Sequence, residues 1–331
     1  MKQRILYLDR IKGLAIILVV IGHLYTFSEA TDGNLVNKFI GSFHMALFMF
    51  VSGFVAYILP PPLDYRSLLT KLLNRCVRYI VPMYVVGWLL YLFALNTVRP
   101  DNNMLLAMRD GVLFGNWYWY LKALTIFSLL SLPIMHGNKI WIDVVCIFVC
   151  YVLFGVLWKY GGEIGANLCM EHATCYFPFF SLGLLTRKYS RLQKLMKSDA
   201  LFAISIVGYV SLFFSTCDIH IVNTLSNRFL LPVCAIVVAF NTLSKMDHKQ
   251  SKILQGLEYF GNNSLQVYLF HYFFVLFVNI HIMWIWGMDN DNNLFMHLCV
   301  LMMSIVIAAL SISVGELLKY SKYISKFIYG K

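Results

Sequence analysis

The residues best suited to chemistry lie in one apolar stretch near the N-terminus, from Tyr7 to Phe27. Asp9 and Lys12 open this stretch, and His23 follows Lys12 by eleven residues. At about 1.5 Å of rise and about 100° of rotation per residue, eleven helical steps cover roughly 16 Å and return to the same helix face. An imidazole takes up or releases a proton near neutral pH. The spacing predicts an ionic pair at one membrane surface and a titratable ring near the bilayer midplane, turned toward a bundle interior or a wet cavity.

Composition identifies the class of protein that holds this ring. Of the 331 residues, 60% are hydrophobic and 13% are charged, and the mean hydropathy is +0.69. Soluble domains carry about 25% charged residues, so we expect an all-α polytopic membrane protein, with one domain over residues 1–331. The net charge of +11 does not predict nucleic-acid binding, because no such motif accompanies it and cytoplasmic loops of membrane proteins collect positive charge.

The positions of the apolar segments and basic residues predict the topology. We expect about ten transmembrane helices, over residues 11–28, 39–59, 79–97, 117–134, 140–158, 173–186, 200–217, 227–243, 263–286 and 295–316. With a cytoplasmic N-terminus, 21 of the 27 lysines and arginines fall in inner segments and five in outer ones. This asymmetry predicts cytoplasmic N- and C-termini in a multi-pass protein of the cytoplasmic membrane.

The cysteines predict neither a metal site nor a fixed disulfide. The eight cysteines lack metal-ligand spacing, so we expect no metal. Three of them fall on the predicted outer side, where a disulfide is possible but not implied: Cys169, Cys175 and Cys217.

Two other spans bring polar side chains toward the depth of His23. Segment 39–59 carries His44 near its outer end and Ser52 about two turns further in. Segment 263–286 carries three polar residues on one helix face, because they are spaced by four and by three: Ser264, Tyr268 and His271. Each of these side chains could instead serve only to bond a neighbouring helix, which contributes about 0.6–2 kcal/mol.

A basic segment precedes the third span. Arg75 and Arg78 lie three residues apart, Lys71 comes before them, and Pro82 follows at a point where a span would bend or begin. Guanidinium groups bind phosphate oxygens in a bidentate manner, so the pair suits a phosphate clamp. Positive charge on the cytoplasmic side explains the same residues without a ligand.

An aromatic run, Trp117 to Tyr120, opens the segment 117–134 at the predicted outer surface. An interfacial aromatic belt explains this run, and so does a platform for a ligand. Lys122 follows about one turn deeper, where it could extend outward to water.

These motifs, in this order, resemble the acyltransferase-3 family of integral-membrane acyltransferases. The family's opening pattern of a basic residue, ten others and a histidine is matched by Lys12 and His23, with Leu8-Asp9 before them. The segment Phe43–Phe54 matches its second-span pattern, Arg75-x-x-Arg78 before Pro82 matches its RxxR, and Gly261–His271 matches its late pattern. The segment Trp117–Leu124 matches a further motif less closely.

The resemblance implies an acyl-CoA co-substrate, commonly acetyl-CoA, that enters from the cytoplasm, and no bound cofactor. It implies that Arg75 and Arg78 hold the donor's phosphates and that Asp9 and Lys12 position the donor or fix the helix end. His23 would act as general base on a hydroxyl of a cell-surface or lipid-linked glycan. The remaining candidates would orient the acceptor or stabilise the oxyanion: His271, Tyr268, Ser264, Ser52 and His44. No SGNH hydrolase domain follows the spans, so we expect the transfer to finish within the bundle.

Two other classes of function use the same residues. A transporter or exporter of glycan precursors or small solutes would line its path with the midplane polar groups, although we find no internal repeat of the kind that transporters carry. A scaffold without chemistry would tolerate replacement of His23. Loss of glycan acylation in a His23→Ala variant separates the enzyme from both.

Overall fold

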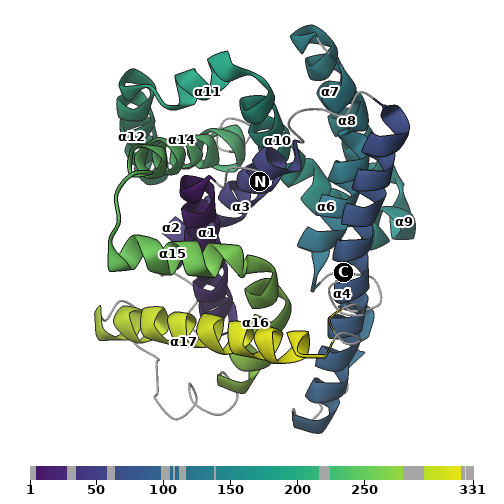
Figure 1. The fold of residues 1–331 in the computed structure, drawn as a ribbon, viewed down its shortest axis with the longest axis vertical. Helices are drawn as coiled ribbons and strands as arrows, with labels where there is room; N and C mark the ends of the chain where they lie inside the picture. The colour runs from purple at the N-terminus through teal and green to yellow at the C-terminus, as the bar shows by residue number, and fades with distance from the viewer. Residues whose placement is uncertain are drawn as a thin grey trace. The chain divides into compact units, whose positions relative to one another are not determined.

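The computed structural model describes residues 5–27, 35–57, 64–97, 105–106, 109–111, 117–137, 139–215, 224–278, 294–321 and 325. These residues form helices and no strand, which confirms the all-α prediction (Figure 1). Contacts divide the chain into two compact units, Met1–Val51 with Leu185–Gly315 and Ser52–Leu184 with Glu316–Lys331. Each unit is described separately below.

Five of the described helices are long and apolar enough to cross a membrane: Leu35–Ala56, Tyr65–Leu95, Ile140–Tyr160, Ser226–Lys245 and Leu294–Lys319. A pair bent by 57°, Ser190–Met196 with Asp199–Phe214, brings the total to six if it forms one span. The protein is therefore a multi-pass membrane protein. The count of ten spans and the cytoplasmic placement of the termini stay predictions.

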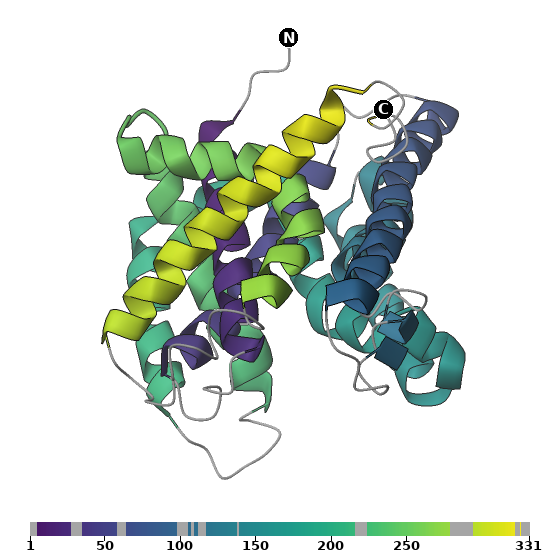
Figure 2. The ribbon, with the colours of Figure 1, turned by 90° about the horizontal axis from the view of Figure 1, so that it is seen from below.

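The first unit is built around α1 (Leu6–Phe27). The helices α14, α15 and α16 and the short α2 all contact α1, and α16 lies beside it in both views (Figure 1, Figure 2). The other elements of this unit are α2 (Leu35–Gly41), α3 (His44–Ala56), α11 (Ser190–Met196), α12 (Asp199–Phe214), the π-helix η1 (Ser226–Leu230), α14 (Leu231–Lys245), α15 (Lys252–Asn262), α16 (Ser264–Val278) and α17 (Leu294–Lys319). The helices α3 and α17 run past the borders of the unit, and α10 (Met170–Lys188) lies mostly in the second unit.

The second unit is built around α4 (Tyr65–Thr97), which packs on α6 (Trp119–Leu130). The sequence places a span boundary near residue 79, but the structure shows one helix of 33 residues with Pro82 inside it. Arg75 and Arg78 therefore lie within α4 rather than in a loop before it. The other elements that lie wholly in this unit are α7 (Leu132–His136), α8 (Ile140–Tyr160) and α9 (Gly162–Asn167).

The helix α15 occupies a segment in which the sequence predicts a cytoplasmic loop, and it crosses α1 (Figure 1). Glycine makes this close crossing possible. A Cβ on Gly13 would overlap the carbonyl oxygen of Leu257, and a Cβ on Gly261 would overlap the carbonyl oxygen of Asp9. Small residues at such a point let two helix backbones touch, so the two glycines fix where α15 meets α1.

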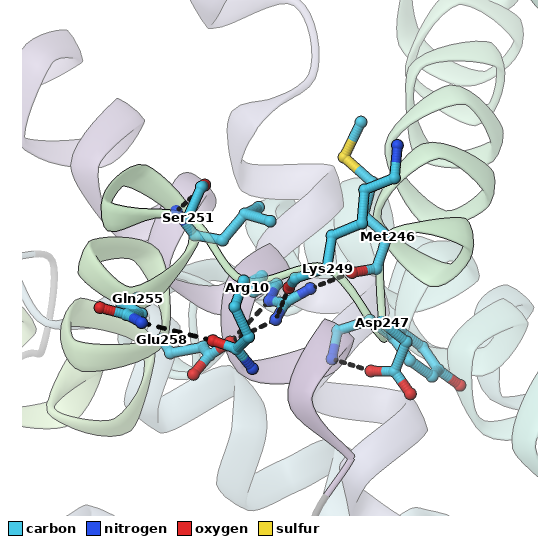
Figure 3. Close-up of polar contacts among 10 residues, drawn as sticks. Arg10, Met246, Asp247, Lys249, Ser251, Gln255 and Glu258 are labelled. Carbon is cyan, nitrogen blue, oxygen red and sulfur yellow. Dashed lines mark hydrogen bonds and ion pairs between the residues drawn. The ribbon is translucent and has the colours of Figure 1, made fainter.

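Arg10 holds the start of α1 against the segment between α14 and α15 (Figure 3). Its side chain is fully buried and pairs with Glu258, with Arg10 Nε 2.7 Å from Glu258 Oε1. The guanidinium also donates to the carbonyl oxygens of Met246 and Lys249. Asp247, in the same segment, accepts the backbone N–H of Tyr7 at 3.0 Å. Burial of a charged guanidinium is costly without partners. The bonds to Glu258, Met246 and Lys249 supply these partners for Arg10.

Candidate active site

His23 lies in a cluster of rings inside the first unit. It belongs to the apolar run of α1, and its side chain is half-buried. Its Nε2 lies 3.1 Å from the hydroxyl of Tyr272 on α16, and the two rings are 4.8 Å apart between centroids. The ring thus faces a neighbouring helix, as its position in an apolar run requires.

His271 packs against the same two rings. Its ring centroid lies 5.2 Å from that of His23 and 4.3 Å from that of Tyr272. The side chain is completely buried. Its Nδ1 lies 2.9 Å from the carbonyl oxygen of Val267 and 2.8 Å from that of Tyr268. A carbonyl only accepts, so Nδ1 carries the proton, and Nε2 of the neutral ring is an acceptor.

His44 approaches α1 from the start of α3. Its Nδ1 donates to the carbonyl oxygen of Ile40 at 2.8 Å. Its Nε2 lies 3.7 Å from the position that a Cβ on Gly22 would take, and Gly22 directly precedes His23. Three histidines that are far apart in the sequence therefore belong to one region of the first unit.

Two other predicted residues of α16 lie on the side of this cluster toward the start of the helix. Tyr268 is buried, and its ring centroid is 5.9 Å from that of His271. Ser264 is the first residue of α16 and is half-buried. It lies seven residues before His271, roughly 10 Å along the helix, which separates Ser264 from the rings.

The predicted ionic pair at the start of α1 is present. Lys12 Nζ lies 2.6 Å from Asp9 Oδ1, one helical turn away. The sequence argument missed the other ion pair, which joins Arg10 to Glu258 on α15. The signal for it was three charged residues within four positions at the start of an apolar helix, more than one pair explains.

Ser52 and the arginines belong to the second unit. Ser52 Oγ lies 2.6 Å from the hydroxyl of Tyr120, a buried residue of α6. Arg75 donates to the carbonyl oxygen of Ala56, the last residue of α3, at 2.9 Å, and Arg78 is exposed on α4. Lys71 is also exposed. Arg75 thus satisfies a carbonyl at a helix end, a role that the clamp hypothesis did not include.

The aromatic run at the start of α6 packs inward rather than forming only a surface belt. Tyr118 and Tyr120 are buried, and the Trp119 ring lies 5.0 Å from that of Tyr176 and 4.3 Å from that of His172. Lys122 donates to the carbonyl oxygen of Asn167 at 2.6 Å. These contacts join α6 to α9 and α10 within the second unit.

The described part of the chain contains neither a cluster of metal-ligand side chains nor a disulfide. No group of three His, Cys, Asp or Glu side chains there is arranged to hold a metal. No disulfide joins Cys169 to Cys175, and Cys217 lies outside the described residues.

The cluster around His23 has two groups that acyl transfer to a hydroxyl uses, an imidazole and a hydroxyl bonded to it. An imidazole removes a proton from an attacking hydroxyl, and a hydrogen bond to the ring fixes its orientation. Tyr272 supplies that bond, and the sequence argument did not select it. The signal was available, since Tyr272 lies four residues after Tyr268, a spacing at which helical side chains are neighbours.

Comparison with known proteins gives one family and one relative. The profile of the acyltransferase-3 family, described as an acyltransferase domain, matches residues 5–314. The nodulation protein NolL of Mesorhizobium japonicum is 25% identical over 191 residues, which cover 55% of this chain. The matched part spans about half of that relative, 48% of its length. No solved structure matches the chain.

Proposed function

The chain belongs to the acyltransferase-3 family, and from that premise we propose that it moves an acyl group from acyl-CoA to a hydroxyl of a glycan. The donor is acyl-CoA from the cytoplasm, with acetyl-CoA as the first candidate. The acceptor is a cell-surface or lipid-linked glycan, so the product is an O-acylated, in the first instance O-acetylated, polysaccharide or its precursor.

His23 is the general base of the proposed reaction. It removes the proton of the acceptor hydroxyl while that oxygen attacks the thioester carbonyl carbon. The tetrahedral intermediate collapses, the C–S bond breaks, and the new ester C–O bond remains. The CoA thiolate takes the proton from the His23 imidazolium, which restores the neutral ring.

The observation that supports this role best is the contact between His23 and Tyr272. A ring held by a tyrosine hydroxyl at 3.1 Å, packed against a second imidazole, keeps a defined orientation toward a substrate. Holding the base in a reactive orientation is one of the main contributions that an enzyme makes to proton transfer.

The donor side of the proposal rests on charge. Coenzyme A is strongly anionic, and α4 carries Lys71, Arg75 and Arg78 within eight residues. We infer that Arg75 and Arg78 bind the donor's phosphates and that Asp9 and Lys12 position the donor or fix the end of α1. Ser52 and His44 are the candidates for orienting the acceptor or stabilising the oxyanion.

Measurement of ester-linked acyl groups on isolated surface glycans tests the proposal. Cells that lack the protein are compared with cells that express the wild type, His23→Ala or His297→Ala. His297 is a matched control, because it also pairs with a tyrosine of α1, with its Nδ1 2.6 Å from the Tyr25 hydroxyl. We expect acylation with the wild type and His297→Ala only. Acylation that survives His23→Ala would contradict the assignment of His23 as the general base. It would favour the alternative functions, a transporter or a scaffold without chemistry.

Binding of acetyl-CoA to the purified protein tests the donor site. Replacement of Arg75 and Arg78 by alanine should weaken binding by at least about tenfold, since each bidentate contact with a phosphate is a strong, charge-assisted one. Arg66→Ala is the control, because Arg66 is exposed on the same helix and nine residues before Arg75. Equal affinity of the wild type, the Arg75 and Arg78 double variant and Arg66→Ala for acetyl-CoA would exclude phosphate binding by Arg75 and Arg78.

A further inference from the structure

Among the rings around His23, one fully buried nitrogen has no hydrogen-bond partner within the described residues. It is Nε2 of His271, on a side chain with no exposed surface. A buried polar atom left without a partner costs roughly 1–3 kcal/mol. Such an atom in a folded protein calls for a reason.

Backbone carbonyl groups determine whether Nε2 of His271 donates or accepts a hydrogen bond. The carbonyl oxygens of Val267 and Tyr268 both lie within 2.9 Å of Nδ1, so the ring proton is on Nδ1. Nε2 then carries a lone pair at the end of the ring away from those carbonyls. A neutral His271 therefore accepts a hydrogen bond and has no proton to give to an oxyanion, so an oxyanion role fits it less well than an acceptor role.

The nearest ring that changes its charge during the proposed reaction is His23. The two imidazole centroids are 5.2 Å apart and their planes are tilted by 30°. At this separation a small tilt of the His23 ring, one that keeps its Nε2 bonded to Tyr272, can bring its other N–H toward His271. A protonated imidazole has two such N–H donors, whereas a neutral one has a single donor.

We propose that His271 is a positioning residue that accepts a hydrogen bond from the His23 imidazolium once His23 has taken the acceptor's proton. The bond forms as the charge forms on His23, and it is released when the imidazolium returns its proton to the CoA thiolate. The carbonyl oxygens of Val267 and Tyr268 accept from the single N–H of Nδ1, which keeps the lone pair of His271 on Nε2 throughout. The proposal rests on the proposed function, because it needs His23 to act as the base.

This arrangement affects the rate rather than substrate binding. An interaction that exists only when charge has developed stabilises the transition state and leaves the ground state unchanged. The cost of the unpartnered nitrogen is present in the resting protein and is removed as the reaction proceeds. Loss of the acceptor should therefore lower kcat and leave KM unchanged.

Two substitutions separate the two nitrogens of His271. The amide of glutamine reaches the position of Nε2, whereas the shorter amide of asparagine reaches that of Nδ1. His271→Gln keeps an acceptor for His23, and His271→Asn keeps only the group that faces the backbone carbonyls. The experiment measures kcat and KM for acyl transfer from acetyl-CoA, with the purified full-length protein in lipid and with thermal unfolding to confirm folding.

We expect His271→Asn to lower kcat by about 10- to 100-fold with KM unchanged, and His271→Gln to retain more of the wild-type kcat. The opposite order, with Asn active and Gln inactive, would assign His271 a purely structural role through Nδ1 and overturn the proposal. Wild-type kcat in both folded variants would overturn it as well. Failure of the proposed function is distinct, since the wild type itself would then transfer no acyl group, or His23→Ala would remain active.

Discussion

The hydroxyl of Tyr272 lies 3.1 Å from Nε2 of His23, so residues that are 249 positions apart in the sequence connect α16 to α1. Two residues further along α1, Tyr25 makes a similar bond to His297 on α17 at 2.6 Å. The helix α1 thus carries two tyrosine–histidine pairs, of which one includes the proposed base. The second pair provides an internal control for the first.

Tyr272→Phe should reduce kcat for acyl transfer by about tenfold or more, because the ring of His23 loses the bond that orients it. Tyr25→Phe removes a similar bond and should cost about 0.5–1.5 kcal/mol of stability without this loss of activity. Kinetics and thermal unfolding of both variants test the difference. Equal effects on activity would mean that the Tyr272 hydroxyl contributes only to stability.

Removal of the Arg10 side chain should strongly destabilise the protein. Arg10→Met leaves Glu258 and two backbone carbonyls without their partner, and breaking a buried ion pair in this way costs about 3–5 kcal/mol. Lys319→Met is the comparison, since Lys319 pairs with Glu316 in an exposed position, where such pairs contribute about 0–1 kcal/mol. Thermal unfolding in detergent should show a large fall in Tm for Arg10→Met alone. Similar Tm values for Arg10→Met and Lys319→Met would show that the bonds of Arg10 do not contribute strongly to the packing of α1.

Gly261→Ala should prevent normal packing of α15 on α1, because the added Cβ meets the backbone oxygen of Asp9. Gly256→Ala lies on the same helix, with nothing within 4 Å of its added Cβ, and should be neutral or stabilising by up to about 1 kcal/mol. The yield of folded protein after detergent extraction and its Tm distinguish the two. A Gly261→Ala protein as stable as the wild type would mean that the helices do not touch at this point.

Ser52→Ala tests whether the Ser52–Tyr120 pair serves the reaction as well as the fold. Loss of this bond alone costs about 0.5–1.5 kcal/mol. Ser42→Ala is the control, because Ser42 Oγ lies 2.8 Å from the Tyr209 hydroxyl in the first unit. If Ser52 stabilises the oxyanion, its variant loses activity by about 10²-fold or more at a similar loss of stability. Equal activity in the two variants would remove Ser52 from the candidate site.

Sequence periodicity predicted the environment of His23 because the apolar pattern and the position of one imidazole are local properties. The spacing of three placed Lys12 one turn from Asp9, the spacing of eleven placed His23 further along the same helix, and all three residues lie in α1. The four-and-three spacing on α16 likewise selected His271, which packs against His23.

The missed features depend on contacts between distant segments. Tyr272 is one of 20 tyrosines in the chain, and its spacing of four from Tyr268 is a weak signal until its contact with His23 is known. The segment of α15 contains two glycines and several polar residues, so its sequence resembled a loop, and packing on α1 made it a helix. Pro82 suggested the start of a span, but membrane helices tolerate proline in their interior.

The length of α1 between Arg10 and His23 is itself part of the proposed catalytic arrangement. Thirteen positions separate them on one unbroken helix, a rise of about 20 Å. Insertion of a single residue between them would turn the His23 imidazole by about 100° relative to the start of α1, which Arg10 holds in place. Arg10, His23 and their partners would all still be present. The proposed site therefore depends on the number of residues in this interval as well as on the identity of the histidine.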